Sequence, residues 1–219
     1  MIFNFRDEMK RFTLIISLIF LQTAFIFADM GGQIELSSGA HFYRDQNSLL
    51  DGSLVTTSDF SACVGISSVF FFGRIGFGEY CTLFFPIQRS STDQPVMGYG
   101  DYQYAIGVDD LLGISLKLIN HDVFKFPVTF GFHTTSSTYE QGGNNTTMVV
   151  TTVGVGLNAT LEFHPSGFVY WFFRVQGAYD FFANLKKTSG DDAATVNINK
   201  IGRTNMLYGA PSFGLGLSF

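Results

Sequence analysis

Apolar residues alternate with small or polar ones along most of the chain beyond residue 32, and this pattern constrains the fold more than any other feature. The longest run places an apolar residue at nearly every second position from Val149 to Phe163. A period of two indicates β-strands whose two faces meet different surroundings. The pattern predicts eight strands, at about residues 33–43, 59–71, 75–85, 110–119, 126–137, 148–163, 168–182 and 206–219.

The segments between the predicted strands alternate in length. Three are short, at residues 72–74, 120–125 and 164–167, and four are long and polar, at residues 44–58, 86–109, 138–147 and 183–205. Short turns at one end of a sheet and long loops at the other are typical of transmembrane β-barrels. The sequence therefore predicts an all-β fold, an eight-stranded antiparallel up-and-down transmembrane β-barrel.

The composition favours lipid over water around this barrel. Only 14% of the residues are charged, against about 25% in a typical soluble domain. A lipocalin-like barrel or a β-sandwich would alternate in the same way, but each needs a well-solvated outer face. An exported soluble β-barrel binding protein is thus the weaker alternative. The formal charge of −5 and the lack of a basic cluster exclude a nucleic-acid partner.

Charged and histidine residues within the well-patterned parts of the predicted strands fall on the face that carries glycine, serine and threonine. A lysine or arginine that faces lipid at the midplane costs about 2–4 kcal/mol, so we expect this face to line the lumen. The predicted lumen charge network consists of Glu35, His41, Glu79, Lys117, His133, Glu162, Arg174 and Asp180. Buried charges need partners, so we expect a salt-bridged plug. The alternative is a gate or a narrow solute path lined by the same groups.

Tyrosine and tryptophan residues cluster near the ends of the predicted strands. Such residues often form aromatic girdles at the two membrane–water interfaces. We expect this placement for Tyr43, Tyr80, Tyr170, Trp171, Tyr179 and Tyr208.

The two cysteines lie in a predicted hairpin. If this hairpin turns around Phe72, Cys63 lies opposite Cys81 on the inward face, and Glu79 also points inward. Cross-strand Cβ atoms are about 4.5–5.5 Å apart, slightly wider than the roughly 3.5–4.5 Å of a disulfide. The sequence therefore leaves a strained Cys63–Cys81 disulfide open.

The first 28 residues resemble an export signal. Lys10 and Arg11 precede an uncharged, largely apolar stretch from Phe12 to Phe27, and the small residue Ala28 follows. This order is typical of a secretory signal peptide. We expect residues 1–28 to be removed and residues 29–219 to form one barrel domain in the bacterial outer membrane.

The C-terminal nonapeptide ends in phenylalanine, with apolar residues at alternate positions: Phe213, Leu215, Leu217 and Phe219. It resembles the insertion signal of bacterial outer-membrane β-barrels. The segment Gly107–Ile114 also resembles the start of a strand in small spirochaete and proteobacterial barrels of the OmpW, OmpX or OmpA type. The resemblance implies recognition by the barrel-assembly machinery, and its OmpW-like part implies transport of small hydrophobic molecules.

No catalytic or cofactor-binding motif is present. The chain has no phosphate-binding loop, no nucleophile elbow and no Cys/His set with metal-ligand spacing. We expect no enzyme activity, metal or cofactor; the one enzymatic alternative is a rim site with His41 and a loop Asp or Ser. The sequence favours a structural or surface-interaction role, with four extracellular loops that contact host or environmental ligands. A narrow channel or transporter for small hydrophobic molecules is the alternative.

Overall fold

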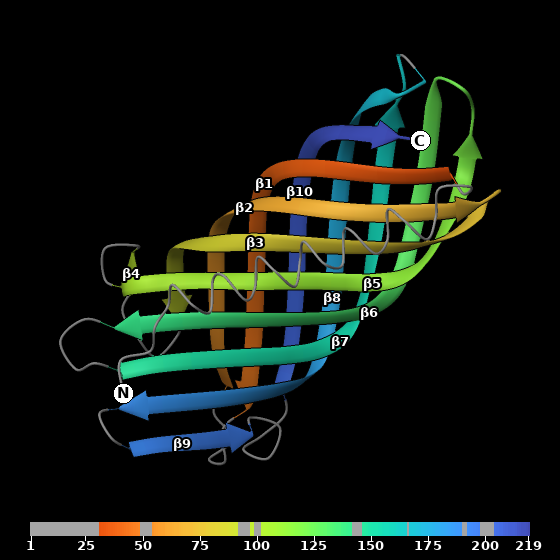
Figure 1. The fold of residues 1–219 in the computed structure, drawn as a ribbon. Helices are drawn as coiled ribbons and strands as arrows, with labels where there is room; N and C mark the ends of the chain where they lie inside the picture. Colours follow the sequence, from red (N-terminus) through yellow and green to blue (C-terminus); the bar gives the residue numbers. More distant parts are fainter. Residues whose placement is uncertain are drawn as a thin grey trace.

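Eight long strands form the protein (Figure 1). The computed structural model describes residues 31–48, 54–91, 97–98, 102–141, 146–165, 167–189, 192–197 and 204–219; the predicted signal peptide lies outside them. The long strands are β1 (Gly31–Ser48), β2 (Leu54–Phe72), β3 (Ile75–Ser91), β5 (Tyr102–Asn120), β6 (Phe124–Gln141), β7 (Thr146–Phe163), β8 (Val169–Ser189) and β10 (Thr204–Ser218). Two short strands, β4 (Met97–Gly98) and β9 (Asp192–Asn197), pair with β3 and β8.

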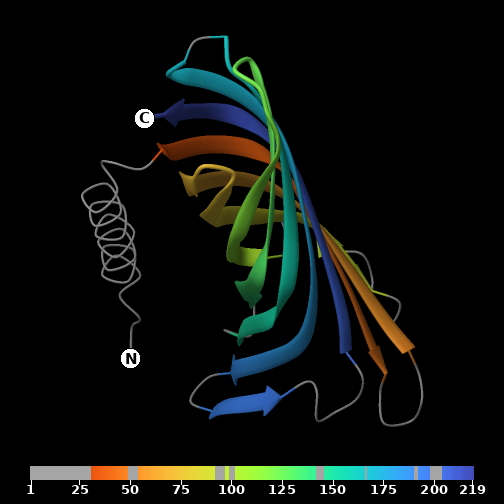
Figure 2. The ribbon, with the colours of Figure 1, turned by 90° about the vertical axis from the view of Figure 1, so that its right-hand side faces the viewer.

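The sheet closes on itself. Each long strand pairs antiparallel with the next along the chain, and β10 pairs with both β8 and β1. The C-terminus therefore lies beside the start of β1, as Figure 2 shows. Backbone hydrogen bonds between Gly32 and Phe219, of 2.8 and 3.0 Å, complete this seam. The predicted eight-stranded barrel and the pairing of its last strand with its first are confirmed.

The strands are longer than the sequence pattern predicts. Much of the four expected loops is strand: β1 continues to Ser48, β3 to Ser91 and β8 to Ser189. In these extensions both faces carry polar residues, as at Arg44 and Asp45, so the alternation fades while the backbone pairing continues. We call this end of the barrel the long-loop end, and the opposite end the short-turn end.

The hairpin of β2 and β3 has a different register from the one predicted. Its turn is Gly73–Arg74, with Gly73 at φ +68°, a conformation that favours glycine and suits a two-residue hairpin turn. Cys63 consequently lies opposite Phe84, and Cys81 opposite Ile66. Cys63 is buried on the inward face, Cys81 points outward, and both are free thiols. The register therefore excludes the Cys63–Cys81 disulfide that the sequence left open.

The same register moves Glu79 to the outward face. Its neighbours Gly78 and Tyr80 are buried toward the lumen, while Phe77, on the face of Glu79, is 48% exposed. The prediction of an inward Glu79 was wrong, because an odd shift in pairing turns every side chain of a strand to the other face. Asp110 on β5 also points outward beside it, opposite Cys81.

Apart from these groups, large apolar side chains dominate the outer face. Leu36, Phe130 and Phe213 are 60% exposed or more, an arrangement that water would penalise and lipid would not. Of the six predicted girdle residues, only Trp171 and Tyr179 are exposed on this face. The remaining four point into the lumen: Tyr43, Tyr80, Tyr170 and Tyr208. No helix among the described residues is long and apolar enough to cross a membrane.

Candidate functional site

The lumen is packed with polar side chains, which form three layers along the barrel axis. From the short-turn end they are the Arg174 layer, the Asp109 layer and the Asp59 layer, each named after its central charge. Each layer draws its side chains from several strands, so the network links strands that are far apart in sequence.

In the Arg174 layer, β1 and β8 contribute an ion pair between Glu35 and Arg174, which are 2% and 5% exposed. Glu35 also accepts hydrogen bonds from Ser67, at 2.6 Å, and from Tyr170, at 2.9 Å. The guanidinium donates to Ser67 and Thr160 and lies 4.6 Å from the ring centroids of Tyr80 and Phe172. Both charges are therefore fully engaged by protein groups.

Glu162 closes the lumen nearer the short-turn end. Its Oε2 accepts hydrogen bonds from Gln33 Nε2, at 3.0 Å, and from His164 Nε2, at 2.8 Å. The His164 ring stacks on Tyr170 with a centroid distance of 4.4 Å. Lys117 lies half-buried above the Phe71 ring, with Nζ 3.9 Å from its centroid, and forms no ion pair with a described acidic residue.

The Asp109 layer is a chain of buried carboxylates and imidazoles. Asp109 Oδ2 lies 3.2 Å from His41 Nε2 and 3.0 Å from His133 Nε2, and Gln176 donates to Asp109 Oδ1. His133 Nδ1 lies 2.7 Å from Asp180 Oδ1. Each His133 nitrogen faces a carboxylate oxygen. With Asp109 and Asp180 both ionised, both contacts are hydrogen bonds only when both nitrogens carry a proton. The geometry therefore assigns His133 as an imidazolium shared by two carboxylates.

A glycine opposite Phe84 allows this layer to pack tightly. A Cβ atom at Gly107, opposite Phe84 across β3 and β5, would lie 2.0 Å from the end of the phenyl ring. The ring instead lies flat over the glycine and stacks on His41, with a centroid distance of 4.2 Å and an interplanar angle of 3°. Small residues on the lumen face thus make room for large side chains from neighbouring strands.

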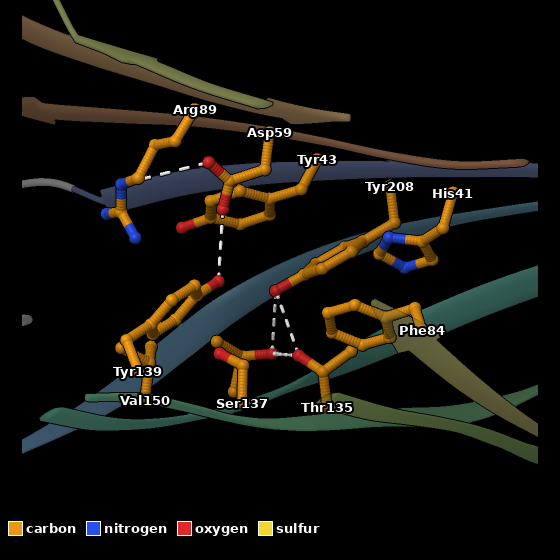
Figure 3. Close-up of a pocket in the computed structure, with 11 residues that line it drawn as sticks. His41, Tyr43, Asp59, Phe84, Arg89, Thr135, Ser137, Tyr139, Val150 and Tyr208 are labelled. Carbon is orange, nitrogen blue, oxygen red and sulfur yellow. Dashed lines mark hydrogen bonds and ion pairs between the residues drawn. The ribbon is translucent and has the colours of Figure 1, made fainter. Parts of the chain in front are cut away.

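The Asp59 layer fills the lumen toward the long-loop end (Figure 3). Asp59 accepts a hydrogen bond from Tyr139 at 3.0 Å, and Arg89 Nε lies 3.7 Å from its other oxygen. Tyr208 is hydrogen-bonded to Thr135, at 3.0 Å. The residues around this layer enclose about 20 Å³, enough for a single water molecule.

His41 lines this space, and its Nδ1 has no hydrogen-bond partner among the described residues. The hydroxyl of Ser61, its neighbour across β1 and β2, has none among them either. Serine and histidine are therefore not bonded to each other, and both are fully buried. The described residues contain no group of three or more His, Cys, Asp or Glu side chains suited to a metal ion.

Seven of the eight residues predicted for the lumen point inward, and Glu79 alone does not. Asp109, the centre of its layer, is absent from the predicted network because the sequence pattern places it in a loop. The alternation could have identified it, since Asp109 shares the face of Gly113, Ser115 and Lys117. The terminal residues Phe213, Leu215, Leu217 and Phe219 lie outward, 43–63% exposed, as predicted.

Of the comparisons with known proteins, the one with solved structures supports this fold. No protein-family model matches the chain, and no curated protein matches it either. Among solved structures, Neisserial surface protein A has a TM-score of 0.53 and 12% identity, over 86% of this chain and 97% of that one. The outer membrane protease OmpT from Escherichia coli has a TM-score of 0.49 and 8% identity, over 87% and 96% of the two chains.

The closed sheet, the apolar outer face and the polar lumen define an integral β-barrel of the bacterial outer-membrane class. At identities this low, the likeness to solved structures concerns the fold alone. The chain is thus a small eight-stranded outer-membrane barrel with a lumen closed by three polar layers.

Proposed function

We propose that this barrel is a non-conducting anchor whose activity lies in the strand extensions and connections at the long-loop end. The observation that carries the proposal is the filled lumen. A solute would have to break the Glu35–Arg174 pair and then the Asp109–His133–Asp180 chain, all of which are buried.

Two features support an interaction role for the long-loop end. The strands project their paired backbone beyond the apolar band there, which gives the connections a rigid base. β9 also adds a further strand to β8 on that side. We assign the protein no catalytic role, because the His41–Asp109 pair is buried below the Asp59 layer.

The rival function is a narrow channel or a transporter of small hydrophobic molecules. Planar-bilayer recording of the purified protein in concentrated KCl distinguishes it from the anchor. We expect no unitary current from the wild type or from Leu36→Ala, a lipid-facing control on the strand that carries Glu35. Reproducible current steps whose size changes in Arg174→Ala, but not in Leu36→Ala, would establish a conducting lumen and refute the closed anchor.

The interaction role has a separate test. We expect shorter connections at the long-loop end to abolish attachment of expressing cells to protein- and glycan-coated surfaces, with the amount of folded barrel unchanged. Unchanged attachment would remove this role while leaving the closed lumen untouched.

A further inference from the structure

A groove lies on the outer wall of the barrel, across β10, β1, β2 and β3, near the long-loop end. It has a volume of about 470 Å³. We call it the outer-wall groove and define it by its outward-facing residues Phe42, Arg44, Ser58, Phe60, Gln88 and Leu207.

The strand register arranges these residues in two rows. The lower row runs from Gly209 through Phe42 and Phe60 to Gln88, and the two phenyl rings lie 5.1 Å apart. The upper row runs from Leu207 through Arg44 and Ser58 to Ser90. The Phe42–Phe60 pair thus lies next to the cation of Arg44 and the hydroxyl groups of Ser58 and Ser90, on the side nearer the short-turn end.

Among the described residues, Arg44 has no acidic partner on this face. Its side chain is exposed and makes no hydrogen bond or ion pair with a described residue. One acidic residue, Asp59, is among those that line the groove, and Asp45 lies beside it. They are 5% and 6% exposed and point into the lumen, where Asp59 is bound by Tyr139 and Arg89. Within the part of the chain that the structure describes, the groove therefore offers an unpaired guanidinium and several neutral donors to an anion.

The groove also lies at the depth of lipid headgroups. Along β1 the outward residues are Leu36, Ser38, Ala40 and Phe42 before Arg44; along β2 they are Ile66, Val64, Ala62 and Phe60 before Ser58. The change from apolar to polar residues marks the membrane–water interface at the long-loop end. An arginine placed there keeps its stem on the apolar surface and its charge among headgroups.

We propose that the outer-wall groove binds the phosphorylated headgroup of an outer-leaflet lipid. The phosphate lies on Arg44, which can hold two of its oxygens at once, with hydroxyl donation from Ser58 and Ser90. The first apolar part of the lipid lies on the Phe42–Phe60 pair.

Gly209 provides a way to block the groove without damage to the barrel. A Cβ atom at this position would have no heavy atom within 4 Å, so Gly209→Leu places its side chain in the open space of the groove. Arg44→Gln removes the charge and keeps a polar side chain of similar reach. Lys186→Gln is the matched control, because Lys186 is an exposed cation near the end of β8, outside the groove.

The test is native mass spectrometry of the folded barrel in neutral detergent, titrated with phosphatidic acid or with diacylglycerol of the same acyl chains, which lacks the phosphate. We expect one retained phosphatidic acid, and about tenfold weaker retention for Arg44→Gln and Gly209→Leu, as for the loss of one charge-assisted contact. Lys186→Gln should bind phosphatidic acid with the wild-type affinity. The wild type should keep this affinity in the presence of millimolar inorganic phosphate.

Equal retention of the two lipids would overturn the proposal, and so would wild-type retention by Arg44→Gln. Displacement by inorganic phosphate would assign the site to a free anion rather than to a lipid. A heat-dependent gel shift checks that every variant is folded before the titration.

Discussion

Arg174→Met should be among the most damaging single substitutions in the lumen. It leaves the Glu35 carboxylate, 2% exposed, with the neutral donors Ser67 and Tyr170 and no cation in contact. A buried ion pair that loses one partner typically costs about 3–5 kcal/mol. We therefore expect a loss of about 3–5 kcal/mol in the free energy of unfolding.

The double variant Glu35→Gln with Arg174→Met should recover most of this loss, because no unpaired charge then remains. Urea unfolding in lipid vesicles measures these values through the fluorescence of Trp171, the one tryptophan in the chain, which is 58% exposed on the lipid-facing side. Lys186→Met, an exposed control, should change the free energy by less than about 0.5 kcal/mol. A loss below about 1 kcal/mol for Arg174→Met would show that water solvates Glu35, and would refute the account of a plug whose charges are satisfied by protein groups.

Three further predictions concern other parts of the barrel. Deletion of Phe219 should lower the amount of folded protein in the outer membrane far more than deletion of a loop residue. Insertion of one residue after Phe213 should lower this amount further, because it turns the apolar side chains of the last strand to the other face. Normal folding of both variants would contradict an assembly role for this strand. Glu79→Leu should raise the free energy of unfolding by about 1 kcal/mol, since it removes a charge that faces lipid, and a decrease would show that the carboxylate has a stabilising partner. Nitrogen NMR of His133 at neutral pH should show two protonated ring nitrogens, whereas one unprotonated nitrogen would reject the imidazolium assignment.

The alternation of residues predicted most of the fold because lipid enforces it. A strand with one face in lipid must keep that face apolar, so the barrel, its closure and the outward position of Phe213 follow from the sequence. Where the strands leave the lipid this constraint ends, and the predicted boundaries therefore stopped short of Ser48 and Ser91.

The details that failed depend on single residues. The pairing of Cys63 is set by which two residues form the turn after Phe72, and apolar residues on both faces of β3 concealed the choice. The inward position of Tyr80 depends on the same register. The inward position of Tyr170 depends on Gly216, the residue opposite it, because a Cβ atom at Gly216 would collide with the Tyr170 ring. Such complementarity between distant strands is not visible in any one segment.

The accessibility of Cys63 tests the closed lumen most directly. Its thiol lies inside the barrel, 4% exposed, and Cys81→Ser leaves it as the one cysteine of the chain. We expect a small, charged, water-soluble thiol reagent to leave Cys63 unmodified in the folded barrel and to modify it fully after denaturation. Modification of the folded protein at the rate of an exposed thiol would show that water and solutes enter the lumen, and would contradict the account.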